Sequence, residues 1–319
     1  MSREGAAVGR LAQRRRLVRL FAFGAVAVLA VVAFSYFHLW RPEGTGPAGP
    51  TVPRAAFSKV WTTRRVALVG LGDSVTAGFG ASRRHSYFDR LVMNPPDEFA
   101  DMRSVCLSAV LPHLDVVNLA VSGSTSLDHI DIVRDRLKPQ DPDTIGLVVM
   151  TSGGNDIIHN YGRTPPREGA MYGATLETAR PWIAAYEQRL SAMLDEIATR
   201  FPGGCHVFLA DIYDPTDAVG DAEHAGLPAW RDGLEVHRAY NDVIRRVAGR
   251  RSFVHVVPMY AEFLGHGIHC TQFWTDHYRP NDAHYWYADN LEDPNDRGYD
   301  AIRRLFLIEI AKIAHELAR

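Results

Sequence analysis

Residues 66–78 read VALVGLGDSVTAG, and this stretch decides the fold. Its first six residues, Val66–Leu71, form an unbroken apolar run that ends in a glycine-rich turn. Short runs without polar alternation are typical of strands buried on both faces of a parallel sheet. Ser74 stands in the turn that follows. We therefore expect a buried parallel strand with a polar turn at its carboxyl end.

Four more apolar runs repeat this pattern further along the chain. They are residues 116–121, 145–150, 206–210 and 253–257. Helical periods lie between and after the runs, in residues 182–197, 234–247 and 302–317. Strands that alternate with helices predict an α/β fold, here a parallel five-stranded sheet with helices on both faces. Such sheets bind their ligands beyond the carboxyl ends of the strands.

The composition excludes some classes of function. The formal net charge of the 319-residue chain is −2, so no overall basic field favours a nucleic-acid partner. Cys106, Cys205 and Cys270 match no zinc or redox spacing. In an exported protein two of them can pair, or all three can be small buried apolar residues.

The first forty residues differ from the rest of the chain. Residues 20–40 are almost entirely apolar and long enough to span a bilayer core. Arginines crowd the segment before them, at Arg10, Arg14, Arg15, Arg16 and Arg19. The positive flank is expected to stay in the cytoplasm, which places the rest of the chain outside it. A cleaved secretory signal and a twin-arginine export signal are the alternatives for this segment.

The domain organisation follows from these segments. We expect a cytoplasmic basic segment over 1–19 and a transmembrane helix over 20–40, with Tyr36 and Trp40 at the membrane interface. Residues 41–56 are rich in Gly and Pro and are interpreted as a linker that lifts the domain off the membrane. Residues 57–319 then form the folded domain.

Three polar turns follow the first three predicted strands. Ser74 stands in the first turn, Gly123 in the second and Asn155 in the third. A serine on a tight turn presents its hydroxyl at the edge of the sheet, and a glycine N–H can bind an anion. An asparagine amide can complete an oxyanion hole. Each signal is weak alone, but all three in this order are strong.

This arrangement resembles the SGNH hydrolase family, also called GDSL esterases. Gly72-Asp73-Ser74 is similar to its first block, Gly123 to its second, and Gly153-x-Asn155-Asp156 to its third. The resemblance implies a flavodoxin-like three-layer α/β/α sandwich. It also implies that Ser74 is the nucleophile, and that the N–H groups of Ser74 and Gly123 and the Asn155 amide form the oxyanion hole. No cofactor is expected.

The last block of the family departs from its pattern here. The family has Asp-x-x-His before the final helix, whereas this chain has Asn290 and Asp293 at those positions. One explanation is that His284 acts as the base and Asp293 orients it, since triads are defined by geometry rather than chain order. A second shifts the register to Pro280-Asn281, with Asp276 and His277 upstream. A third is that the triad is broken. His266, His269 and His277 are expected to be structural.

Several loops near the site carry further signals. The insertion 159–175 is a candidate lid or specificity loop. Aromatic residues crowd 273–290 and suit either sugar rings and acyl chains or packing within the loop itself. Asp211, Asp214, Asp217 and Asp221 can in principle hold Ca²⁺, but their spacing matches no EF-hand loop, so a capped turn is favoured and no metal is expected.

The sequence thus predicts a membrane-tethered, extracytoplasmic serine ester hydrolase that works through an acyl-Ser74 intermediate. Its expected partners are an ester substrate, either a small molecule or a glycan, and the membrane through the N-terminal helix. Two alternatives stay open. One is an O-acyltransferase that passes the acyl group to a glycan, and the other is a catalytically impaired module that binds esters or carbohydrate.

Overall fold

The computed structural model describes residues 3–317, with side chains from residue 13 onward. The strands are β1 (Val66–Leu71), β2 (Leu114–Asn118), β3 (Ile145–Met150), β4 (Cys205–Ala210) and β5 (Val254–Val257). They form one parallel sheet in the order β2-β1-β3-β4-β5. Gly70 of β1 lies opposite Asn118 of β2 and Val149 of β3, so these strands end side by side. The predicted five-stranded parallel sheet is confirmed.

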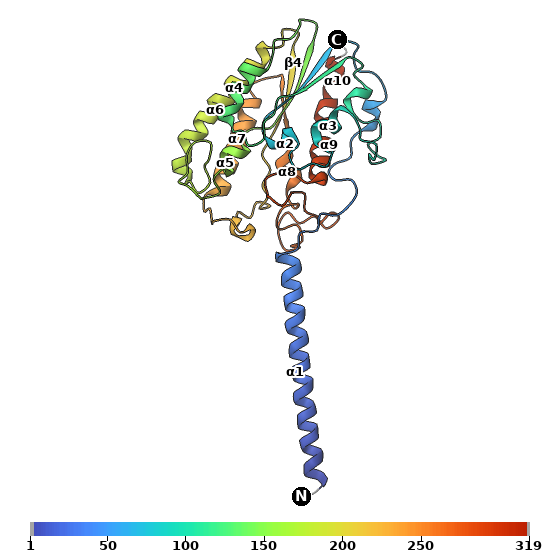
Figure 1. The fold of residues 1–319 in the computed structure, drawn as a ribbon, viewed down its shortest axis with the longest axis vertical. Coiled ribbons are helices and arrows are strands. Elements are labelled where there is room, and N and C mark those ends of the chain that lie inside the picture. The colour runs from blue at the N-terminus through green and yellow to red at the C-terminus, as the bar shows by residue number, and fades with distance from the viewer. Residues whose placement is uncertain (1–2, 318–319) are drawn as a thin grey trace.

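Helices cover both faces of this sheet, as Figure 1 shows. Helices α4, α6 and α7 pack together on one face, and α3 and α9 pack together on the other. The helices are α1 (Arg3–His38), α2 (Ser74–Ala77), α3 (Tyr87–Val92), α4 (Ser126–Arg136), α5 (Gly154–Ile158), α6 (Leu176–Thr199), α7 (Gly233–Ala248), α8 (Met259–Phe263), α9 (Asp296–Lys312) and α10 (Ala314–Leu317). Short 3₁₀ turns occupy Arg54–Phe57, Leu107–Ala109 and Ala222–Ala225.

The alternation of side chains along β1 explains why its sequence is apolar throughout. Val66 and Leu68 belong to the core beneath α3 and α9, whereas Ala67 and Val69 belong to the core beneath α4, α6 and α7. A strand with helices on both faces has no polar side. The central strand therefore fixes both layers of packing at once.

Strand β2 differs from the buried strand that its apolar run predicts. It stands at the edge of the sheet, and Val116 and Val117 are exposed. The run 116–121 is also shifted against the observed strand, because Leu119 and Val121 already lie in the turn, where their N–H groups bond to Gly70 and Gly72 carbonyls. Apolar content alone does not separate an edge strand from a central one.

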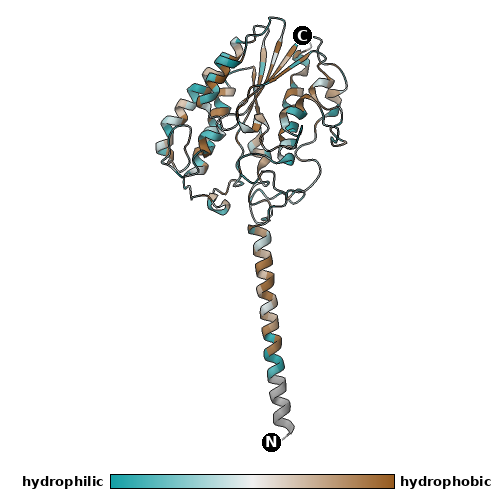
Figure 2. Ribbon diagram, viewed as in Figure 1, coloured by the Kyte–Doolittle hydropathy of each residue, from teal (hydrophilic) through white to brown (hydrophobic). Residues whose placement is uncertain are grey.

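Helix α1 projects from the domain as a single long helix (Figure 1). Its part Gln13–His38 is long and apolar enough to cross a membrane, and its side chains there are not buried in the protein. Figure 2 shows the hydrophobic colour in the half of α1 nearest the domain and the hydrophilic colour in the described part further out. The predicted transmembrane range 20–40 coincides with this apolar half.

The segment 41–56 is irregular, as expected for a linker, but it is packed on the domain rather than spacing it from α1. Ala48 and Val52 are buried. The Ala48 N–H donates to Asp300 over 3.0 Å. The Pro42 carbonyl accepts from the N–H of Tyr285 over 2.7 Å. The segment therefore behaves as part of the domain.

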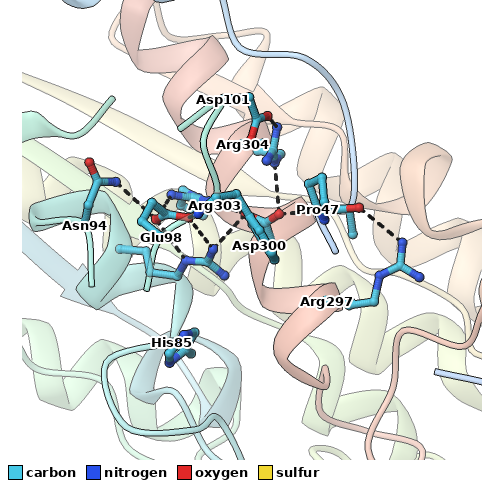
Figure 3. A network of polar contacts seen from close by, with 12 residues as sticks. Pro47, His85, Asn94, Glu98, Asp101, Arg297, Asp300, Arg303 and Arg304 are labelled. Atoms are coloured by element: carbon cyan, nitrogen blue, oxygen red, sulfur yellow. Dashed lines mark hydrogen bonds and ion pairs between the residues drawn. The ribbon is translucent and has the colours of Figure 1, made fainter. Parts of the chain in front are cut away.

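A buried ion cluster holds the segment 41–56 on the domain (Figure 3). Glu98 accepts from Arg90 over 2.8 Å and from Arg303 over 2.6 Å. Asp300 is bonded to Arg303 and, over 3.1 Å, to Arg304. All five side chains are buried. Because the same Asp300 carboxylate accepts from the backbone of the segment, the cluster joins α3, α9 and the chain that leads to α1.

Candidate active site

Ser74 stands where β1 ends, as its sequence position predicts. It is the first residue of α2, and the Asp73 side chain caps this helix by accepting from the Val75 N–H over 3.1 Å. Gly72 has a φ of 122°, and a Cβ there would lie 2.1 Å from the Thr151 carbonyl oxygen. Glycine is required because the backbone passes so close to the end of β3. This close approach turns the chain and brings Ser74 to the edge of the sheet.

Asp73 lies inside the site, and no Lys, Arg or His among the described residues forms an ion pair with it. Its carboxylate accepts from the Thr151 hydroxyl over 2.7 Å. Burial raises the pKa of Asp73 to about 6, although the hydrogen bonds from Thr151 and Val75 act in the opposite direction. The charge of Asp293 raises this pKa further. Asp293 therefore lies within electrostatic reach of the residue next to Ser74.

The second and third turns are bonded to each other and to the first. The Asn155 amide donates to the Ser124 carbonyl over 2.8 Å, and the Ser124 hydroxyl lies 3.2 Å from the Gly72 carbonyl. An amide group has two hydrogens, so one remains for a ligand. Gly123 has a φ of 80°. A Cβ there would meet nothing within 4 Å, so glycine is favoured by the backbone conformation and not by a lack of space.

Ser74 and Asn155 line one pocket at the carboxyl edge of the sheet. Its volume is about 140 Å³, where one water needs roughly 10–15 Å³. Gly123 is not among the lining residues. The apolar part of the wall includes Ile157, Ile158, Tyr161, Tyr172, Leu227, Trp230, Leu234 and Met259. Tyr161 and Tyr172 come from the insertion 159–175, which therefore forms wall of the pocket.

The last block places a carboxylate beside the site. Asp293 is 2% exposed and accepts from the Asn290 amide over 2.7 Å through Oδ2. Its Oδ1 is buried without a partner among the described residues. Asn290 also accepts from the backbone N–H of Asp293 over 3.1 Å. An amide thus donates to a carboxylate at the two positions where the family pattern has a carboxylate and an imidazole.

His284 lies elsewhere, so the structure does not contain the predicted pair of His284 and Asp293. The Nδ1 atom of His284 lies 2.5 Å from Asp282, which also pairs with Arg297 over 2.8 Å. The imidazole lies over Gly44 in the segment after α1. His284 is not among the residues that line the pocket. Asp282 and not Asp293 is its partner, because Asp293 is turned inward to Asn290.

Two other histidines of this region, His266 and His269, make structural contacts. The ring of His266 stacks on Trp286 at 3.4 Å between centroids, and Nε2 of His269 lies 2.7 Å from Asp221. Trp286 is buried, as are Tyr285 and Tyr287, so much of the aromatic stretch 273–290 belongs to the core rather than to a binding platform.

Two pocket residues, His237 and Glu292, have no counterpart in the sequence analysis. His237 of α7 lines the pocket, with Nε2 3.1 Å from the Tyr213 carbonyl, and burial lowers its pKa. Glu292 also lines the pocket. Burial, together with the charge of Asp293, raises the pKa of Glu292 to about 7. The position of Glu292 between Asn290 and Asp293 was the available signal, but a lone Glu in a loop carries no motif.

The acidic residues after β4 act as turn caps. Asp214 accepts from the N–H and hydroxyl of Thr216, and Asp217 accepts from the N–H groups of Gly265 and Gly267. Among the described residues no group of three His, Cys, Asp or Glu is arranged to hold a metal ion. Cys106, Cys205 and Cys270 carry free thiols.

Comparisons with known proteins place the fold. An acetyl xylan esterase of Geobacillus stearothermophilus is 18% identical, with 79% of this chain and 97% of that chain covered and a TM-score of 0.50. A lipase/acylhydrolase from Enterococcus faecalis is 15% identical, over 77% and 95% of the two chains, with a TM-score of 0.46. A phospholipase A1 from Streptomyces albidoflavus is 17% identical, over 79% and 99%, with a TM-score of 0.46. No curated protein sequence matches the chain.

The family is settled by a match that covers more than half of the sequence. Residues 71–301 match the model of the GDSL-like Lipase/Acylhydrolase family. The match begins at the turn that carries Ser74 and ends inside α9, so it spans all the turns described above. The chain belongs to the GDSL-like lipase/acylhydrolase family and is a hydrolase of ester bonds.

Proposed function

We propose that the protein cleaves carboxylic esters through an acyl intermediate on Ser74, from a position tethered to the outer side of the cytoplasmic membrane. One observation carries the chemistry: Ser74 and Asn155 line the same pocket beyond the central strand. The Ser74 hydroxyl attacks the ester carbonyl, the bond to the alcohol breaks and the alcohol leaves with the proton taken from Ser74, and water then cleaves the acyl-Ser74 bond to release the acid. The free hydrogen of the Asn155 amide and the N–H groups of Ser74 and Gly123 receive the oxyanion. One such donor contributes roughly 10²–10³ in rate.

The proton of Ser74 needs an acceptor whose pKa lies near the working pH. Among the described residues no histidine is hydrogen-bonded to Ser74 or to Asp293. Of the titratable groups that line the pocket, Glu292 has a pKa raised to about 7. Asp73 is occupied as a helix cap, and burial lowers the pKa of His237. Glu292 is therefore our candidate for the general base.

The proposed location of the catalytic domain is based on α1. The apolar part of Gln13–His38 supplies a membrane anchor, and the arginines Arg14, Arg15, Arg16 and Arg19 precede most of it. The positive-inside tendency then puts the catalytic domain outside the cytoplasm. A tag at the C-terminus tests this: protease added to intact cells removes it if the domain is outside, and spares it if the domain is inside.

The chemistry is tested with the full chain in detergent, with p-nitrophenyl acetate as substrate. We expect turnover that Ser74→Ala abolishes and that Ser252→Ala leaves intact, since Ser252 is exposed and lies ahead of β5. A fluorescent phosphonate that labels nucleophilic serines should mark the parent protein and not Ser74→Ala. Absence of both turnover and labelling would reject the hydrolase chemistry and favour a module that only binds esters.

A further inference from the structure

The end of α1 is hydrogen-bonded to the domain. Gln272 donates from its side-chain amide to the Phe37 carbonyl over 3.0 Å, and the Thr271 hydroxyl donates to the Tyr36 carbonyl over 3.3 Å. Nε2 of His224 lies 3.1 Å from the His38 carbonyl. The last carbonyls of a helix have no partner within it. Here the domain supplies these partners, so the end of the helix is held against the domain.

Apolar side chains surround this junction. Phe273 is 63% exposed and Trp274 is 51% exposed, and both rings pack against Phe37, at 5.6 and 4.9 Å between centroids. Leu39 and Trp40 are exposed beside them. We call Leu39, Trp40, Phe273 and Trp274 the junction collar. Large exposed aromatic residues at the end of an apolar helix are typical of the interface between lipid and water.

The length of α1 puts the collar at that interface. At about 1.5 Å per residue, the apolar stretch from Leu20 to His38 spans about 28 Å. The hydrocarbon core of a bilayer is about 30 Å thick. A helix that fills the core therefore ends where the collar begins, and no spacer remains between the headgroups and the domain.

The loops that hold α1 also form a wall of the pocket. Asp221 pairs with His269 over 2.7 Å, and Asp217 accepts from the His269 N–H over 3.0 Å. The N–H of Ile268 donates to the Pro215 carbonyl over 2.8 Å. Pro215, like Thr216 and Gly220, lines the pocket with Ser74. A continuous set of bonds thus runs from the helix end to the pocket wall.

The carboxyl edge of the sheet, where the parallel strands end, faces α1. In Figure 1 the helices α2 and α8, which follow β1 and β5, lie toward the α1 end of the domain, while the C-terminus lies at the opposite end. The pocket is built on that same edge. An ester that enters from the α1 side meets the collar first and Ser74 afterwards.

We propose that the junction collar rests in the headgroup layer of the bilayer, so that the pocket opens toward the membrane and receives esters carried by membrane lipids. The hydrolysis of these esters rests on the proposed function. The orientation of the domain on the membrane rests only on the contacts of α1. The apolar lining of the pocket, from Ile157 to Leu234, suits an acyl chain delivered from the lipid.

The test uses the full chain reconstituted in vesicles of phosphatidylcholine and phosphatidylglycerol. Two substrates with the same leaving group are compared: p-nitrophenyl acetate in the water, and p-nitrophenyl palmitate dissolved in the vesicle. The double variant Phe273→Ser/Trp274→Ser should lose about tenfold on the palmitate, equivalent to about 1.4 kcal/mol, and keep its rate on the acetate. Val60→Ser, an exposed apolar residue ahead of β1, is the matched control.

A second readout does not depend on activity. Lipids brominated near their carbonyl end should quench part of the tryptophan emission, and Trp274→Phe should remove a share of that quenching, because Trp61, Trp230 and Trp286 are buried in the domain. Equal quenching in the parent and Trp274→Phe, or equal loss on both substrates, would overturn the orientation. Quenching as expected with no hydrolysis of either ester would instead overturn the hydrolase chemistry and leave the orientation standing.

Discussion

Two groups of carboxylates lie wholly or partly inside the molecule, in opposite environments. Glu98 and Asp300 lie among three arginines in the cluster between α3 and α9 (Figure 3). Burial alone would raise the pKa of Glu98, but the hydrogen bonds from Arg90 and Arg303 outweigh it and lower that pKa to about 2. Glu98 is therefore ionised at neutral pH, and its charge is paired with Arg90 and Arg303.

The second group lies at the carboxyl edge of β1. Among the described residues no salt bridge reaches Asp73, Asp293 or Glu292, and burial raises the pKa of Asp73 to about 6 and of Glu292 to about 7. Uncompensated buried carboxylates cost free energy of folding. A paired cluster contributes to the architecture, whereas an unpaired one with perturbed pKa values marks the place where chemistry is done.

The largest effect is expected from Glu292→Gln. If Glu292 takes the proton from Ser74, the variant loses about 10²–10⁴ in kcat, the usual contribution of a general base. The parent should lose activity as the pH falls through about 7, because protonated Glu292 cannot accept a proton. The measurement is the rate of p-nitrophenyl acetate hydrolysis from pH 5 to 9.

Glu223→Gln serves as the control, since Glu223 lies in the 3₁₀ turn after β4 and does not line the pocket. A parent profile without a limb near pH 7, together with an unchanged kcat in Glu292→Gln, would remove Glu292 from the mechanism.

The paired group is broken by Arg303→Met. This change leaves Glu98 and Asp300 with fewer donors in a buried site, and removing one partner of a buried pair typically costs about 3–5 kcal/mol. Arg246→Met breaks an exposed pair with Glu187 and should cost about 0–1 kcal/mol. Denaturant unfolding of both variants in detergent at pH 7 gives the difference. Similar losses in the two variants would mean that the buried cluster contributes no more than a surface pair.

The fold was predictable because it depends on local patterns. The run Val66–Leu71 is apolar on both faces, and the stripe through Tyr186, Leu190 and Ile197 has the helical period, so the layers follow from the residues themselves. The edge position of β2 did not follow, because Val116 and Val117 have the same composition as buried residues. Whether a strand lies at the edge or in the centre of the sheet depends on the order of all the strands, and the sequence of one strand does not encode that order.

The site was predictable where it depends on backbone turns and not where it depends on the direction in which a side chain points. Gly72, Gly123 and Gly153 all have positive φ, and their spacing after strands is visible in the sequence. The contacts of His284 with Asp282 and of Asp293 with Asn290 join residues that are two and three positions apart, and they take the place of the predicted pair of His284 and Asp293. His284 was predicted to be the base because it lies close to Asp293 in the sequence. Closeness in the sequence does not determine the direction in which a side chain points.

Asp73→Asn is expected to have a moderate effect, and this effect is a gain in folding stability rather than a loss. The amide oxygen can accept from Thr151 and Val75 as the carboxylate does, but it carries no charge to bury. Because the folded pKa of Asp73 is raised from 3.8 to about 6, the carboxyl group lowers the stability of the fold progressively as the pH rises from about 4 to 6, and by its full amount above pH 6. The variant should be more stable than the parent at pH 7, by about 1–3 kcal/mol, and the gain should vanish below pH 4. A gain that stays constant from pH 4 to 7 would show that charge is not its cause.

The smallest effect is expected from Asp293→Asn, and it tests whether the unpaired carboxylates act on each other. The charge of Asp293 raises the pKa of both Asp73 and Glu292. Without it the ionised form of Glu292 is less disfavoured, so its pKa falls and the acid limb of the rate profile moves to lower pH, by a fraction of a unit. The Asn290 amide retains an oxygen to which it can donate, so the loop is expected to keep its shape. An acid limb that does not move would mean that burial alone sets the pKa of Glu292, whereas a loss of rate at every pH would give Asp293 a direct part in the reaction.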